Sequence, residues 1–151
     1  MFKKIKVLIK DQLQQGTSPE RLAQSMALGI WMGACPVIGI STVIAAGIAH
    51  VFKLNHVVVQ TVNYAMYPVQ IPLIPLYLKA VSWFTDVGFV PLRPDLLVEE
   101  FQASPQNFIS KYSMVLVYAI IFWLIGGGIL FPVMTRILVP VVVRLRFSKK
   151  M

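Results

Sequence analysis

Neutral polar side chains lie beside two interruptions in the apolar segments of this sequence, and they are the side chains best suited to bind a ligand. The set consists of Ser41, Thr42, Asn63, Tyr67 and Gln70. Their hydroxyl and amide groups can donate hydrogen bonds to a phosphate, and helix N-termini at the interruptions would add a partial positive charge. If the interruptions meet, we expect this set to line one cavity that binds an anionic head group without a fixed cation. The alternative is that these side chains only join helices to one another.

Residue patterns that carry catalysis or bind metal ions do not occur in the sequence. His50 and His56 are six positions apart, whereas a helical metal pair needs a spacing of four, and no carboxylate lies nearby. There is no Ser-His-Asp arrangement, H-E-x-x-H motif, P-loop or G-x-G-x-x-G motif. A proton relay would need an acid inside the membrane, and the uncharged runs contain none. We therefore expect no enzyme activity, no cofactor and no metal site.

Three long runs without Asp, Glu, Lys or Arg indicate that the chain is embedded in a membrane. They are Leu22–Phe52, Leu54–Leu78 and Tyr112–Thr135. A crossing needs about 20 mostly apolar residues to span roughly 30 Å of hydrocarbon, and the whole chain has a mean hydropathy of +0.72. We predict an all-α, polytopic integral membrane protein with a re-entrant helical hairpin broken by proline and glycine, and about two full crossings.

The first interruption divides the longest run into two short helices. Ser18 is a predicted N-cap, and the first helix should extend from Glu20 to about Ala34, before a second helix that Ser41 or Thr42 caps. Each arm has about 13–15 residues and measures roughly 20 Å, too short to cross alone. We therefore favour a re-entrant hairpin over one long kinked crossing. The residues expected to break the helices are Gly33, Pro36 and Gly39 in this interruption, and Pro68 and Pro72 in the second.

Small residues are repeated every fourth position along the first predicted helix. Ser25, Gly29 and Gly33 form this ridge. A ridge of small residues lets the backbones of two helices approach closely in lipid. The helix should therefore pack against a neighbour along this face. The next helix is expected to start at Asn55 as its N-cap.

The charges indicate the orientation. The chain has 14 Lys and Arg against 6 Asp and Glu, and the basic residues gather at its two ends. Because cytoplasmic segments carry an excess of Lys and Arg, we expect both termini in the cytoplasm and no nucleic-acid binding. The segment 86–110 carries net negative charge and is expected outside. The predicted units are a basic amphipathic helix (1–16), a broken-helix membrane core (17–85), an external polar loop (86–110), and a transmembrane helix with a basic tail (111–151).

Four motifs in residues 18–83 resemble the sequence pattern of a known family. They are Ser18-Pro19-x-x-Leu22-Ala23-x-Ser25-x-Ala27-Leu28-Gly29, Gly33-x-x-Pro36-x-x-Gly39-x-x-Thr42, Phe52-Lys53-Leu54-Asn55 and the proline-rich stretch Pro68–Tyr77. In order and spacing this segment resembles a bacterial membrane family known as domain of unknown function 2062. The family usually has an Asn-Pro pair in the second interruption, where this chain has Tyr67 before Pro68. The resemblance implies a polytopic protein of the bacterial inner membrane, joined in some relatives to glycosyltransferase domains, and no established activity.

Two functions fit these features. The first is a protein that binds or translocates a lipid, an isoprenoid-phosphate or a phospholipid, at a polar groove formed by the broken helices. The alternative is a non-catalytic subunit or scaffold of a larger inner-membrane complex, and an ion channel ranks third. The expected partners are membrane lipids, with further copies of the chain or other membrane proteins. A wet polar cavity would favour lipid binding, whereas a dry packed interior would favour the scaffold.

Overall fold

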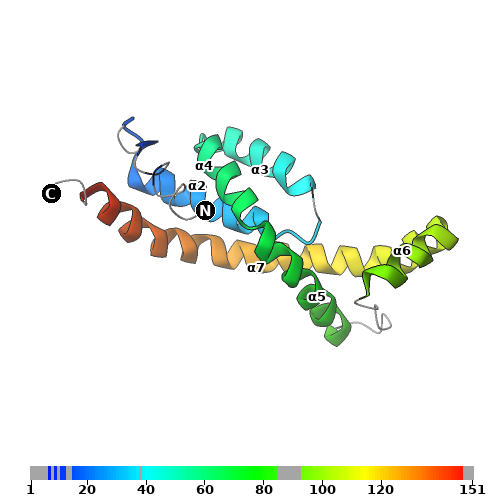
Figure 1. Cartoon of the computed structure of the whole chain (residues 1–151). Coiled ribbons are helices and arrows are strands. Elements are labelled where there is room, and N and C mark those ends of the chain that lie inside the picture. Colours follow the sequence, from blue (N-terminus) through cyan, green and yellow to red (C-terminus); the bar gives the residue numbers. More distant parts are fainter. Residues whose placement is uncertain are drawn as a thin grey trace.

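Every regular element in the described part of the chain is an α-helix (Figure 1). The computed structural model describes residues 7, 9, 11–12, 15–37, 39–84 and 93–147, which contain no strand. The helices are α2 (Pro19–Gly33), α3 (Ile40–Val51), α4 (His56–Ala65), α5 (Tyr67–Phe84), α6 (Pro94–Ala103) and α7 (Pro105–Phe147). The prediction of an all-α fold is confirmed. The predicted N-terminal helix falls mostly outside the described residues.

The longest helix, α7, is the one element of the described residues that is long and apolar enough to cross a membrane. Its 43 residues extend for about 65 Å at 1.5 Å per residue. It continues through Pro132 and Pro140. The uncharged run Leu54–Leu78 is divided between α4 and α5. Neither helix is both long enough and apolar enough to be a candidate span by itself.

Helices α2 and α3 form a hairpin. Ser18 caps α2 as predicted, because its Oγ accepts a hydrogen bond from Arg21 N at 3.3 Å. Gly39, at a φ of 92°, is the N-cap of α3 and makes no side-chain capping bond. The expected cap at Ser41 or Thr42 is therefore wrong, because the left-handed backbone at Gly39 already turns the chain into the helix. The two ends of the hairpin meet where Arg21 Nη1 donates to Phe52 O at 2.7 Å.

The second interruption is shorter than the sequence predicts. Asn55 caps α4, since its Oδ1 accepts from Val58 N at 3.0 Å. The chain leaves the helix only at Met66 and re-enters it at Tyr67. Pro68 lies in the first turn of α5, where a missing N–H leaves no bond unmade. Pro72 lies inside α5 and does not break it, because a proline removes one ladder bond while the bonds on either side persist.

The ridge of small residues on α2 packs against α4, as predicted. A Cβ atom added at Gly29 would lie 2.7 Å from Val59 O and 2.8 Å from Val62 Cβ. One added at Gly33 would lie 3.0 Å from Asn63 O and would also collide with the Met66 side chain. These distances are shorter than real Cβ contacts, so only glycine permits the two helices to approach so closely.

Helix α7 runs antiparallel to α2 and also packs against α5 and α6. Leu22, near the start of α2, shares a buried cluster with Val142 near the end of α7, while Trp31 contacts Trp123. Helix α5 crosses the first half of α7, where Val81 packs in a cluster with Val115 and other α7 residues (Figure 1).

The segment predicted as an external loop contains regular structure. Its described residues 93–110 form α6 and the first turns of α7. Tyr112 Oη donates to Glu100 Oε2 at 2.6 Å, and Lys111 pairs with the other oxygen of Glu100. These bonds, with that from Lys111 the stronger, hold the pKa of the Glu100 carboxyl below its ordinary value. Glu100 therefore joins α6 to α7 and is not a freely solvated acid.

Candidate functional site

Two of the predicted ligand-binding residues meet between α3 and α4. Asn63 Nδ2 donates to Thr42 Oγ1 at 3.3 Å, and Gln60 Nε2 donates to the Thr42 carbonyl at 3.0 Å. Asn63 is completely buried, as is Ser41 in the first turn of α3. These contacts connect the two helices through polar side chains inside the packed core.

Gln70 lies at the point where the two interruptions meet. Its side chain is 1% exposed, and Nε2 donates to Cys35 O at 2.7 Å. Nearby on the same helix, Tyr77 Oη donates to Ala34 O at 2.9 Å. Side chains of α5 thus satisfy the carbonyls that the end of α2 leaves free, as buried backbone groups require. Tyr67 is half-buried, with its ring 5.7 Å from that of Tyr64.

Two cavities lie beside α7, one between α2, α3 and α7 and one between α5 and α7. None of the five predicted residues lines either of them. Three of them keep a buried oxygen without a partner among the described residues, namely Ser41 Oγ, Asn63 Oδ1 and Gln70 Oε1. The hydrogen bonds of Asn63 to Thr42 and of Gln70 to Cys35 O join different parts of the chain. Ligand binding by this set stays a prediction.

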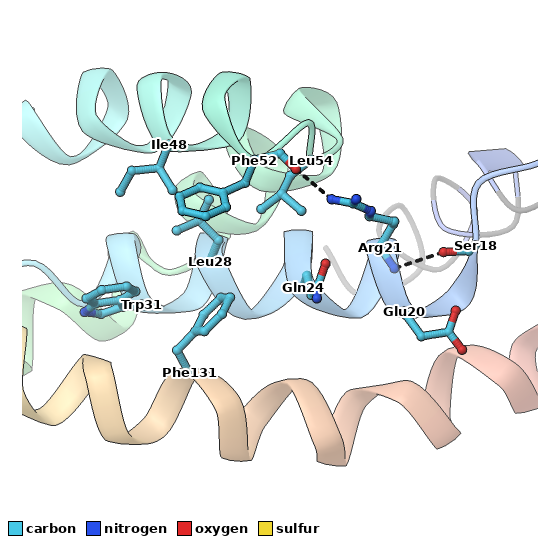
Figure 2. A pocket seen from close by; sticks show the side chains of 10 residues that line it. All are labelled: Ser18, Glu20, Arg21, Gln24, Leu28, Trp31, Ile48, Phe52, Leu54 and Phe131. Atoms are coloured by element: carbon cyan, nitrogen blue, oxygen red, sulfur yellow. Dashed lines mark hydrogen bonds between the residues drawn. The ribbon is translucent and has the colours of Figure 1, made fainter.

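An amphipathic cavity of about 510 Å³ lies between α2, α3 and α7 (Figure 2). Ile48 and Phe52 extend toward α2 from one side, and Phe131 extends toward it from α7 on the other. The full lining consists of Ser18, Glu20, Arg21, Gln24, Leu28, Trp31, Ile48, Phe52, Leu54 and Phe131. The volume falls in the range of roughly 300–1,000 Å³ that is typical of small-molecule sites.

The polar part of this cavity comes from the first turns of α2. Arg21 uses Nη1 to bind Phe52 O, and a guanidinium has five N–H donors, so further donors remain available. Glu20 is exposed, and Gln24 is half-buried one turn further along the helix. The N-terminus of α2 adds its partial positive charge here. This end therefore offers a cation, an anion and an amide.

The apolar part of the cavity ends at a pair of tryptophans. The rings of Trp31 and Trp123 lie 5.6 Å apart. Trp123 Nε1 donates to Trp31 O at 2.9 Å, and Trp31 Nε1 donates to Trp123 O at 3.4 Å. A side chain at Gly127 would collide with the Trp31 indole. The pair joins α2 to α7 beside the cavity and satisfies both indole N–H groups.

A second, almost wholly apolar cavity of about 350 Å³ lies on the other side of the turn that follows α2. It lies between α5 and the first half of α7, and its lining includes Pro36, Tyr77 and Ala119. It has no charged side chain in its lining, so the first cavity is the better candidate site for a ligand with a polar head.

Sequence reasoning missed the residues of the first cavity. The sequence assigns Glu20 only to the start of the first helix and gives Arg21 no role. The available signal was that Arg21 directly precedes the longest uncharged run, as a charge anchored at a membrane surface would. Nothing in the sequence pairs this position with Phe52 or Phe131.

The fold and the cavity define an all-helical protein with one helix able to cross a membrane and an amphipathic cavity beside it. The chain belongs to a family described as an uncharacterized protein conserved in bacteria (DUF2062), which matches residues 3–150. The match extends beyond the segment 18–83 that carries the motifs. No curated protein and no solved structure matches the chain.

Proposed function

We propose that the chain is an integral protein of the bacterial inner membrane with both termini in the cytoplasm. In this arrangement α7 crosses the membrane, α4 and α5 together make the second crossing, and the α2–α3 hairpin enters and leaves on the cytoplasmic side. The antiparallel packing of α2 on α7 supports the hairpin. Trp31 meets Trp123 near the middle of the uncharged run Tyr112–Thr135, and the hairpin ends meet at Arg21 and Phe52.

Single cysteines test this topology. In a Cys35→Ala background, a Ser104→Cys variant should react in intact cells with a membrane-impermeant maleimide, whereas a Ser148→Cys variant should react only after the cells are opened. Ser148 lies in the basic C-terminal segment, and basic segments stay in the cytoplasm, whereas Ser104 lies in the acidic segment 86–110. Labelling of Ser148→Cys in intact cells would show that the proposed orientation is wrong.

We further propose that the protein is a non-catalytic lipid-binding protein whose site is the 510 Å³ cavity. The observation that carries this proposal is the division of one cavity into a charged rim and apolar walls. Arg21 would bind the phosphate of a head group through charge-assisted hydrogen bonds, and the N-terminus of α2 would add to that attraction. The walls formed by Leu28, Ile48 and Phe131 would pack against the first part of an apolar chain through van der Waals contacts.

An Arg21→Gln variant is expected to bind phospholipid about tenfold more weakly, because one charge-assisted bond contributes on the order of 1.5 kcal/mol or more. Glutamine is shorter than arginine and loses the bond to Phe52 O, so the free energy of unfolding is measured beside lipid binding to separate the two effects. Binding is measured by the quenching of Trp31 and Trp123 fluorescence with brominated-chain lipids, in a Trp83→Phe background. Arg93→Gln, which removes an exposed cation from α6, is the matched control and should leave binding unchanged.

Asn63→Ala and Gln70→Ala distinguish this site from the polar set predicted from the sequence. Each is expected to lower the free energy of unfolding by about 1–3 kcal/mol, because a buried polar partner is lost, while lipid binding persists. If these two variants lose lipid binding at unchanged stability while Arg21→Gln binds lipid normally, the lipid site lies at the two interruptions and not in the cavity.

A scaffold role is the second candidate, and the packed polar contacts favour it. Gln70 and Asn63 lie in the core, away from either cavity. If no lipid binds in an Arg21-dependent manner and other membrane proteins co-purify in mild detergent, the scaffold role replaces lipid binding.

A further inference from the structure

The charged rim of the cavity carries one base and one acid, in adjacent positions of the same helix turn. Arg21 and Glu20 both line it. We infer that the site selects a zwitterionic phospholipid whose head group has a primary ammonium beside a phosphodiester, as in phosphatidylethanolamine. This inference rests on the proposed lipid-binding function and names the lipid class that the rim fits.

Glu20 is the residue that determines this selectivity. Its carboxylate is exposed and has no hydrogen-bond or ion-pair partner among the described residues. An ionised carboxylate can only accept hydrogen bonds, and a primary ammonium supplies three donors. A lipid ammonium at this position would therefore form the charge-assisted bond that no side chain of the described chain provides.

The two charged groups lie in the same turn of α2 and point in different directions at the rim. Figure 2 shows the Arg21 guanidinium directed toward α3, where it binds Phe52 O, and the Glu20 carboxylate directed toward α7. A phosphodiester beside Arg21 and an ammonium beside Glu20 would bridge the mouth of the cavity, with the acyl chains toward Leu28 and Phe131. The side-chain amide of Gln24 can donate to the phosphate or accept from the ammonium.

The same arrangement disfavours an isoprenoid-phosphate. A terminal phosphate monoester carries close to two negative charges at neutral pH, and Glu20 would repel it while Arg21 supplies a single positive charge. A phosphodiester carries one negative charge, which Arg21 alone can balance. Of the two lipid classes expected from the sequence, the rim therefore fits the phospholipid.

The experiment compares phosphatidylethanolamine, phosphatidylcholine and phosphatidylglycerol with identical brominated chains, with the full chain in detergent micelles and the Trp83→Phe background. We expect phosphatidylethanolamine to bind about threefold to fivefold more tightly than the other two, the range of an exposed ion pair. Glu20→Gln should remove this advantage and leave phosphatidylglycerol binding unchanged or tighter. Glu99→Gln, an exposed acid on α6, is the matched control and should retain the preference.

The outcomes separate this inference from the function on which it rests. Equal binding of the three lipids, or a preference for phosphatidylglycerol, overturns the inference, as does a phosphatidylethanolamine preference that survives Glu20→Gln. In each of these cases lipid binding in the cavity stands, provided that Arg21→Gln weakens binding of all three lipids. Binding that Arg21→Gln does not change overturns the proposed function itself.

Discussion

Replacing Gly29 with valine is expected to reduce the free energy of unfolding by about 3 kcal/mol or more, at or above the upper end of the usual range for overpacking. The added side chain would begin 2.7 Å from the backbone oxygen of Val59. A backbone atom inside a helix cannot move alone, so α4 would have to separate from α2 along its length. Gly33→Leu should behave similarly, because the Asn63 carbonyl lies 3.0 Å from the position of its Cβ.

Thermal unfolding in detergent, followed by circular dichroism, measures this effect. Gly47→Ala is the matched control, because no atom lies within 4 Å of the added Cβ. It should stabilise α3 by about 0.5–1 kcal/mol through the higher helix propensity of alanine. Ile44→Leu, at a side chain that is 39% exposed, should be neutral. Gly39→Leu should lose about 1–2 kcal/mol, because its φ of 92° is strained for any other residue. Equal stability of Gly29→Val and Gly47→Ala would show that α2 and α4 are not closely packed.

A Trp123→Ala variant is expected to lose about 3–5 kcal/mol of stability, the usual range for removing a buried aromatic side chain. Trp123 is 6% exposed and contacts Trp31 from the opposite helix. Its removal leaves a void between α2 and α7 and takes away the indole that donates to Trp31 O at 2.9 Å.

The same unfolding measurement tests this prediction with two further variants. Trp83→Ala removes an indole that is 74% exposed and should change the stability of the isolated protein in detergent little. Trp123→Phe keeps one aromatic ring but loses the N–H donor and part of the ring volume, so it should lose about 1–3 kcal/mol, less than Trp123→Ala. If Trp123→Ala and Trp83→Ala unfold at the same temperature, the tryptophan pair does not hold α7 against α2.

Local signals in the sequence were sufficient for the all-helical class, for the N-caps of α2 and α4 and for the first interruption. Ser18 and Asn55 are N-caps because a side-chain oxygen followed by a helical segment satisfies free N–H groups wherever the helix later packs. The break that Pro36 and Gly39 make depends on the φ angles these residues can adopt, and the ridge at Gly29 and Gly33 depends on residue size. All of these are properties of a few consecutive residues, and they can be read without knowledge of the fold.

The partners of each helix were decided only by the tertiary structure. In a chain this apolar, hydrophobic periodicity does not separate a face that contacts another helix from one that contacts lipid. Gln70 donates to Cys35 O just beyond the end of α2 because α5 passes that end, which no neighbouring residue indicates. The cavity joins Arg21, Phe52 and Phe131 from three helices far apart in the sequence. Such a site exists only after the helices pack, because its shape is the space that their side chains leave between them.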